Sequence, residues 1–247
     1  MRVALCFSGL PRFWQIGYKF HYENLIKEYT PDIFIHTWYD NDIKEHQEFI
    51  ETYKPKRYGA DKNNQLILKQ AYPRGTSERY KAYNIFSFYK SIQACNNIKR
   101  LYEVENKFRY DWVFRLRVDY AINRKFDLNT LYNDNIHFPS DLRERNMVTD
   151  QFAFSSSQNM DIYSGVYDFL DDYYNKGEDM VGEHMLIRHL KEKDVYYNRQ
   201  YHDMNHPFYP GTAGSMDNSL IRQNITLKPE FSNLFTGVIN ERQTAHT

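Results

Sequence analysis

Short apolar runs and longer stretches with helical spacing alternate along most of the chain. Apolar runs bounded by turn-forming residues are typical of buried strands, and apolar residues that recur every three or four positions are typical of amphipathic helices. Strands are predicted over residues 2–7, 32–38, 56–59, 112–117, 135–139, 151–155 and 194–198. Helices are predicted over residues 15–29, 42–53, 77–104, 158–174 and 183–193.

This alternation predicts the fold class. Strands that alternate with helices form parallel sheets with crossover helices, so we expect an α/β domain whose mostly parallel, Rossmann-like sheet is flanked by helices. The domain should span residues 1–199. Residues 200–247 are polar and contain scattered Pro and Gly, which predicts an irregular C-terminal arm that packs on or near the functional site.

The longest predicted helix, residues 77–104, carries the clearest local signals. Thr76 and Ser77 are predicted to cap it, and Glu78 suits the positive end of the helix dipole. Before it, residues 61–75 are polar and rich in turn-forming residues, so we expect a loop.

Charge and composition narrow the possible functions. The 247 residues include 32 Lys and Arg and 32 Asp and Glu, so the formal net charge is zero. A protein that neutralises many phosphates needs an excess of basic side chains, which argues against a nucleic-acid binder. No apolar run approaches the roughly 20 residues of a membrane span, no signal peptide is evident, and Cys6 and Cys95 form no disulfide framework. We expect a cytoplasmic protein, or one peripheral to a membrane.

The first predicted strand ends in a turn that suits a phosphate. Ligands of open α/β sheets bind outside the carboxyl ends of the strands. Here Gly9 lets the backbone approach a phosphate, Ser8 lies beside it, and Arg12 can clamp phosphate oxygens. The turn matches neither G-x-G-x-x-G nor a Walker A loop, which disfavours a dinucleotide or P-loop site.

A second group of polar residues lies at the end of the strand 112–117. Arg115, Arg117 and Asp119 alternate along the chain and are predicted to share one face. Such charges are costly in a core unless they are paired or lie at a rim. Asp119 follows the strand end, where a carboxylate can hold a divalent cation that bridges two phosphates. The alternative is an Arg–Asp ion pair that ties the strand to a helix.

Four ordered runs carry a family resemblance: DIFIHTW (32–38), YDWVFRLRVDY (110–120), VTDQFAFSSSQNMDIY (148–163) and GEHMLIRHL (182–190). Together they resemble small bacterial and viral glycosyltransferases of the GT-A type that act in polysaccharide biosynthesis, over roughly residues 1–195. The resemblance implies a GT-A-like fold, a nucleotide-diphosphate-sugar donor, and Mn²⁺ or Mg²⁺ as cofactor. By the same resemblance, Ser8, Gly9 and Arg12 match the first loop of the family, which lies against the nucleotide.

The resemblance also assigns a metal site. Asp119 matches the metal-binding carboxylate of the D-x-D motif, but Arg117 stands where a second Asp is expected. Arg117, together with Arg115, could therefore neutralise part of the donor diphosphate. A further metal ligand late in the chain is implied, and His202 is the candidate, with Asp203 and His206 nearby.

An inverting transfer needs a carboxylate base near the acceptor hydroxyl. Glu183, at the start of a predicted helix, is the first candidate and Asp150, before the strand 151–155, is the second. Both have simpler interpretations, because an acid in the first turn favours the helix dipole and an Asp often caps a turn.

The function expected from these residues is transfer of a sugar from a nucleotide-diphosphate-sugar to a glycan or lipid-linked acceptor, with metal assistance. A non-catalytic module that binds a sugar nucleotide or a glycan is the main alternative, since Arg117 has replaced a motif acid. A nucleotidyltransferase also uses a carboxylate–metal site on an α/β sheet, but the first loop lacks the Gly- and Lys-rich sequence that would favour one.

Overall fold

The structure is a computed structural model that describes residues 1–39, 43–62, 66–77, 81–122, 124–139 and 148–200. The predicted arm over residues 200–247 falls almost wholly outside the described residues, and so does His202.

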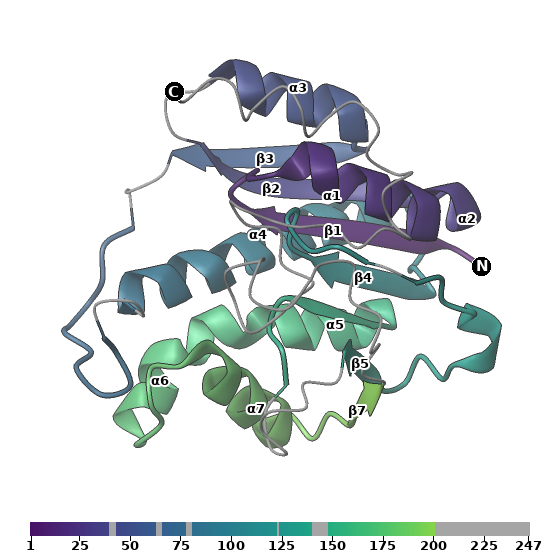
Figure 1. The fold of residues 1–247 in the computed structure, drawn as a ribbon. Helices are drawn as coiled ribbons and strands as arrows, with labels where there is room; N and C mark the ends of the chain where they lie inside the picture. Colours follow the sequence, from purple (N-terminus) through teal and green to yellow (C-terminus); the bar gives the residue numbers. More distant parts are fainter. Residues whose placement is uncertain (40–42, 63–65, 78–80, 123, 140–147, 201–247) are drawn as a thin grey trace, which may run out of the picture.

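The described residues form one seven-stranded sheet of order β3-β2-β1-β4-β6-β5-β7. Its strands are β1 (Val3–Gly9), β2 (Asp32–Tyr39), β3 (Arg57–Lys62), β4 (Trp112–Leu116), β5 (Ile136–Pro139), β6 (Phe152–Ser155) and β7 (Tyr197–Gln200). Strand β6 runs antiparallel to both of its neighbours, whereas every other pair is parallel. The predicted fold class, a mostly parallel α/β sheet flanked by helices, is therefore confirmed (Figure 1).

Helices connect the strands and cover both faces of the sheet. They are α1 (Trp14–His21), α2 (Lys27–Tyr29), α3 (Ile43–Tyr53), α4 (Ala82–Asn106), α5 (Ser157–Ser164), α6 (Leu170–Asn175) and α7 (Gly182–Glu192). A π-helical segment, η1 (Tyr22–Ile26), joins α1 to α2, and short 3-10 segments are η2 (Leu128–Thr130) and η3 (Gly165–Phe169). Within the described ranges, no helix is long and apolar enough to cross a membrane.

Alternate residues of the central strands feed two separate hydrophobic cores. In β1, Ala4 and Cys6 join the core that contains α4, α5 and α7 residues, whereas Val3, Leu5 and Phe7 join the core on the α1 and α3 side. This is the period of two that a strand buried on both faces requires. The result is a three-layer arrangement, with α1–α3 on one face and α4–α7 on the other (Figure 1).

Several predicted boundaries differ from the structure. Helix α4 begins at Ala82 rather than residue 77, and its N-cap, Lys81, makes no side-chain capping bond. The predicted cap Thr76 instead donates its hydroxyl to the Tyr72 carbonyl at 2.6 Å, which closes a turn of its own. Strand β3 continues to Lys62, into the predicted loop. The prediction stopped short because the strand residues alternate between half-buried and exposed and form no apolar run. The helix predicted over 158–174 is divided into α5, η3 and α6.

Helix α1 packs closely on the segment that follows β4. Gly17 packs so closely on this segment that a Cβ there would collide with the Val118 carbonyl oxygen. His21 lies between the Tyr53 hydroxyl, 2.8 Å from its Nδ1, and the Tyr120 carbonyl oxygen, 2.7 Å from its Nε2. Since a carbonyl only accepts, Nε2 carries the proton and Nδ1 accepts from Tyr53. Residues 118–120, which follow β4, are therefore fixed against α1.

His21 should make the stability of the protein sensitive to acid. Its complete burial lowers its pKa from 6.5 to about 4, although the bond to Tyr120 and the charge of Asp119 oppose this. Between these two pH values the unfolded chain binds a proton that the folded chain does not, so stability falls as the pH falls through this window. From pH 7 to pH 4.5 the expected loss from this residue is about 2 kcal/mol.

The measurement is urea unfolding of wild type and His21→Gln at both pH values. Glutamine keeps a donor near the Tyr120 carbonyl but does not titrate. We expect the variant to lose less stability on acidification than wild type. Equal losses would show that His21 does not titrate in this window.

Candidate functional site at the carboxyl end of the sheet

The candidate site lies where β1 and β4 end side by side. Residues Phe7 and Leu116 are register partners near the ends of these two parallel strands. Strands β2 and β3 lie on one side of β1, and the next strand along the chain, β4, lies on the other side. Ligands of open α/β sheets bind where the strand order reverses in this way. Because β6 is antiparallel, its beginning also lies at this end, where the Arg117 amide donates to the Gln151 carbonyl at 3.1 Å.

The first loop has the predicted glycine, but its amide is already used. Gly9 has a φ of 110°, a conformation that favours glycine, and a Cβ built on it meets nothing within 4 Å. Its N–H donates to the Ser91 hydroxyl of α4 at 2.9 Å. Ser8 is buried, whereas Arg12 is exposed. The loop therefore presents an open Cα face and an exposed guanidinium, but not the Gly9 N–H.

Arg115 lies inside the protein beneath the site. Only 2% of it is exposed, and its guanidinium stacks 4.5 Å from the centre of the Phe88 ring. One terminal nitrogen donates to the Asp150 carbonyl oxygen and the other to the Ser8 hydroxyl at 3.3 Å. Its Nε has no hydrogen-bond partner in the part of the chain that the structure describes. Arg115 thus ties the first loop to the start of β6.

Arg117 and Asp119 form a separate pair at the rim. The guanidinium donates from Nε and Nη2 to the two carboxylate oxygens at 2.8 and 2.7 Å. The Asp119 side chain is 3% exposed and that of Arg117 is 25% exposed. Strand β4 ends at Leu116 and a turn follows, so the strand alternation behind the prediction of one shared face stops there. The three side chains fall into two groups: Arg115 contacts Ser8 and Asp150, and Arg117 pairs with Asp119.

A divalent cation is poorly matched by the ligands that this site offers. Among the described residues no group of three His, Cys, Asp or Glu side chains is arranged to hold a metal ion. Both oxygens of the one predicted motif carboxylate, Asp119, already accept from Arg117. The described donors alone therefore do not fit Mn²⁺ or Mg²⁺, and the metal site of Asp119 with His202 stays a prediction.

The two predicted acids lie close together at the start of α7. A Cβ on Gly182, the first residue of α7, would lie 2.6 Å from Asp150 Oδ2, so this carboxylate sits directly against the first turn. Glu183 is the next residue and is half-buried. A carboxylate at the positive end of a helix is stabilising, so Asp150 supports α7 whatever else it does.

Two buried tyrosines complete this corner of the site. The Tyr89 hydroxyl of α4 donates to the Gly182 carbonyl at 2.7 Å, and the Tyr163 hydroxyl of α5 donates to the Asp150 carbonyl at 3.3 Å. Burial raises the pKa of Tyr89 well above its usual value, and the charges of Asp150 and Glu183 add to this. Burial raises the pKa of Tyr163 to about 12, opposed by Arg115. Both tyrosines therefore stay neutral donors near the two acids.

Sequence reasoning missed the part that α4 plays. Tyr89 is fully buried in the core, and its hydroxyl also fixes α7 by donating to the Gly182 carbonyl. Ser91, which accepts from Gly9 and lies 2.9 Å from His36 Nδ1, was not singled out. The available signal was a hydroxyl among the apolar positions of a long helix, together with a histidine inside an apolar strand.

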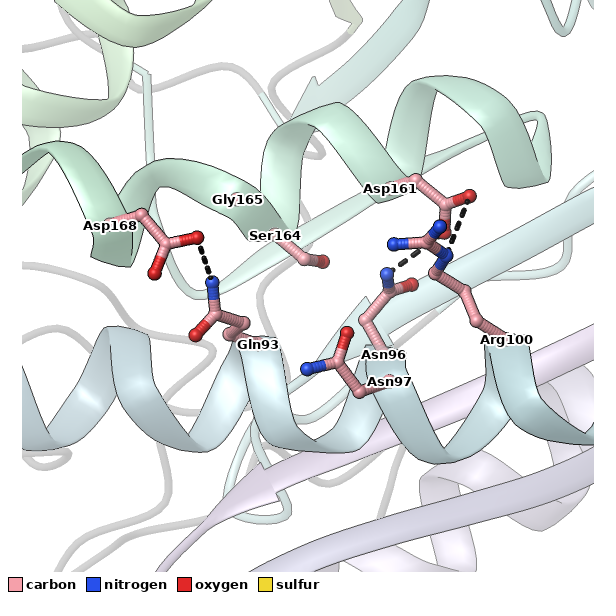
Figure 2. Close-up of a pocket in the computed structure, with 8 residues that line it drawn as sticks. All are labelled: Gln93, Asn96, Asn97, Arg100, Asp161, Ser164, Gly165 and Asp168. Carbon is pink, nitrogen blue, oxygen red and sulfur yellow. Dashed lines mark hydrogen bonds and ion pairs between the residues drawn. The ribbon is translucent and has the colours of Figure 1, made fainter.

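A hollow of about 270 Å³ lies elsewhere, between α4 and the α5–η3 segment (Figure 2). Its lining is polar and consists of Gln93, Asn96, Asn97, Arg100, Asp161, Ser164, Gly165 and Asp168. Figure 2 shows that many of these groups already pair with one another: Gln93 donates to Asp168 at 2.7 Å, and Asn96 donates to Asp161 at 2.8 Å. None of the predicted site residues lies in the lining, so this hollow and the candidate site at the sheet end are different places.

Comparison with known proteins gives a family match. The family model described as a domain of unknown function (DUF7796) matches residues 1–158. No curated protein matches the sequence. Among solved structures, a protein from Desulfovibrio desulfuricans G20, described as a "putative nucleotide-diphospho-sugar transferase", is similar with 11% identity and a TM-score of 0.42, covering 81% of this chain and 80% of that one. Similarity at this level does not carry an activity from one protein to the other.

The contact between Asp150 and α7 predicts a steric effect of Gly182→Ala. The new Cβ would press on Asp150 Oδ2, which must then move, and overpacking of this kind costs about 1–3 kcal/mol. Gly165→Ala is the matched control, because its Cβ would meet only His189 Nε2, at an ordinary 3.9 Å. Urea unfolding of both variants measures the difference.

A double variant identifies the colliding group. In an Asp150→Ala background, Gly182→Ala should cost much less than it does alone, because the carboxylate is gone. The same cost in both backgrounds would show that Asp150 does not press on α7.

Proposed function

The chain belongs to the domain family DUF7796, whose function is unknown, and we propose that this member is a glycosyltransferase. It would transfer a sugar from a nucleotide-diphosphate-sugar to a glycan or lipid-linked acceptor. The observation that carries the proposal is the convergence at one sheet end of the first loop, the Arg117–Asp119 pair and the two acids beside α7. The resemblance of the four ordered runs to GT-A glycosyltransferases supplies the reaction class.

In the proposed complex the donor diphosphate lies over the first loop. Gly9 leaves open space above its Cα, and Arg12 and Arg117 are the guanidinium groups at least partly exposed to solvent there. A guanidinium fork matches phosphate oxygens and stabilises the charge that develops on a leaving diphosphate. Asp119 would hold Arg117 in place by its bidentate contact.

Glu183 is the better candidate for the base. Asp150 packs its carboxylate on Gly182 and its carbonyl oxygen accepts from Arg115, so its role in supporting the structure is already large. Glu183 is the second residue of α7, directly after Gly182. A base must come within hydrogen-bond reach of the acceptor hydroxyl, so the proposal requires the acceptor to bind beside the first turn of α7, where the half-buried Glu183 lies.

One observation favours a second candidate, a non-catalytic module that binds a sugar nucleotide or glycan. Arg117 occupies the Asp119 carboxylate, which the reaction with a metal would need free. The two candidates differ in turnover: a binder holds a ligand but releases no nucleoside diphosphate.

The deciding experiment combines binding and turnover on the purified chain. Nucleoside diphosphates and nucleotide-sugars are screened by thermal shift, with Mn²⁺, with Mg²⁺ and with a chelator, because a bound ligand raises Tm by mass action. Nucleoside diphosphate release is then followed with any donor that binds, with and without glycan acceptors. Release of diphosphate supports a transferase, binding without release supports the module, and release of pyrophosphate from nucleoside triphosphates would indicate a nucleotidyltransferase. A flat screen under all conditions would overturn the proposal.

The Arg117–Asp119 pair should be essential for turnover. We expect Asp119→Asn and Arg117→Gln each to lower kcat/KM about 100-fold or more, because each disturbs the group that faces the leaving diphosphate. Lys125→Gln is the control, since Lys125 is exposed and pairs with Glu28 on the surface. Transfer at the wild-type rate by Asp119→Asn, with and without added metal, would refute both the metal role of Asp119 and its support of Arg117.

Substitutions of Glu183 and Asp150 should have different effects on kcat and on Tm. Glu183→Gln is expected to lower kcat about 100- to 10,000-fold with little change in donor KM or Tm. Asp150→Asn should lower Tm as well, because its carboxylate supports α7. Steady-state kinetics and thermal unfolding of both variants measure this. A full loss of kcat in Asp150→Asn at unchanged Tm, with an active Glu183→Gln, would make Asp150 the base.

A further inference from the structure

A chain of polar contacts runs from the end of β3 to the first loop. Asp61 Oδ2 lies 3.4 Å from His36 Nε2, and His36 Nδ1 lies 2.9 Å from the Ser91 hydroxyl oxygen. The same oxygen accepts the Gly9 N–H at 2.9 Å. Ser91 is completely buried and His36 is 4% exposed, whereas the Asp61 side chain is 45% exposed. The chain thus links a solvent-facing carboxylate to the loop through three secondary-structure elements.

Along these contacts, each donor can be matched with one acceptor. With the His36 proton on Nε2, toward the Asp61 carboxylate, Nδ1 is left as an acceptor. Ser91 then donates its hydroxyl proton to Nδ1, which leaves its oxygen lone pairs for the Gly9 N–H. Burial lowers the pKa of His36, opposed by Asp61, in accord with this neutral tautomer.

The Ser–His–Asp order is that of a hydrolase triad, but the geometry does not suit a nucleophile. Ser91 has no exposed surface, and its oxygen is engaged by a backbone amide. Its hydroxyl also lies 3.2 Å from the His36 carbonyl oxygen, a second acceptor for the same proton. Ser91 can therefore keep its bond to Gly9 whichever acceptor it uses. This arrangement holds a backbone group in place and does not expose a reactive one.

We infer that Ser91 is a positioning residue for the donor site, oriented by His36 and Asp61. The inference rests on the proposed function. Gly9 has a left-handed φ and no neighbour over its Cα, so packing alone does not fix it from that side. The bond from its amide to Ser91 fixes the peptide between Ser8 and Gly9. Ser8 in turn accepts from Arg115, which joins the loop to Asp150. Loss of the Ser91 hydroxyl would leave the Gly9 N–H without its acceptor and loosen this end of β1 before any ligand binds, although Gly9 still pairs with Thr37 of β2.

The first part of the test needs no ligand. Hydrogen exchange of the Gly9 amide, followed by NMR, should accelerate at least 10-fold in Ser91→Ala, because its acceptor is removed. Ser91→Cys retains a weaker acceptor and should fall between wild type and alanine. The control is Ser87→Ala on the same helix, whose hydroxyl donates only to Asn84 among the described partners and should leave Gly9 exchange unchanged. Unchanged Gly9 exchange in a folded Ser91→Ala or Ser91→Cys would overturn the inference.

The second part measures the affinity for whichever nucleoside diphosphate binds wild type most tightly in the thermal-shift screen. Isothermal titration should show Kd about 10-fold weaker for Ser91→Ala, in the order wild type, cysteine, alanine. Equal Kd values, with Gly9 freed, would refute the positioning role while leaving the proposed function intact. Failure of wild type itself to bind would instead refute the proposed function, and with it the donor role of Ser91.

Discussion

Burial of the Arg115 guanidinium is the constraint on which the site depends. Removing a charge from water costs several kcal/mol unless hydrogen bonds and nearby groups compensate. Here the compensation comes from separate segments: the hydroxyl of Ser8, the carbonyl oxygen of Asp150 and the face of Phe88. Each segment must therefore be in place for the charge to be tolerated. The end of β1, the start of β6 and helix α4 are held in one arrangement as a result.

A second buried charge network holds the helices on the same face. Lys99 of α4 is completely buried and donates to Ser157 at 2.6 Å and to Asp161 at 2.9 Å, with Glu103 3.5 Å away. Breaking such a pair by removing one partner is usually far more costly than the pair is worth. Helix α5 is thus fixed on α4, and Tyr163 of α5 reaches Asp150 from a defined position.

Much of the fold was accessible from the sequence because it depends on local patterns. Apolar runs marked β1, β2 and β4, and the alternation with helices predicted the parallel sheet. Boundaries failed where a local signal had another use: Thr76 resembles a helix cap but closes a turn before α4. The polar strand β3 was predicted too short because only half of its residues pack inward.

The site was predictable in part. The strand-end rule pointed to Ser8, Gly9 and Asp119, which lie near one another because β1 and β4 are parallel and end together. Asp150 lies at the same end for a different reason, because β6 is antiparallel and begins there. The rule could not show that Arg117 turns back onto Asp119, since that depends on where β4 stops. Nor could it reveal Ser91, which is 82 residues from its partner Gly9. Contacts across such separations depend on tertiary packing and leave no pattern in the local sequence.

The contacts between α4 and α5 bear on how much of the chain must be present for it to fold. The family match ends at residue 158. It includes Ser157, which accepts a hydrogen bond from Lys99, but stops before Asp161, which also accepts from Lys99. A fragment cut there would retain the buried lysine without its closest carboxylate. It would also lack most of α5, all of η3, which contacts α4, and α6 and α7, whose buried residues belong to the same core. We therefore expect the cooperative folding unit to be larger than the matched segment and to extend at least through Glu192 at the end of α7.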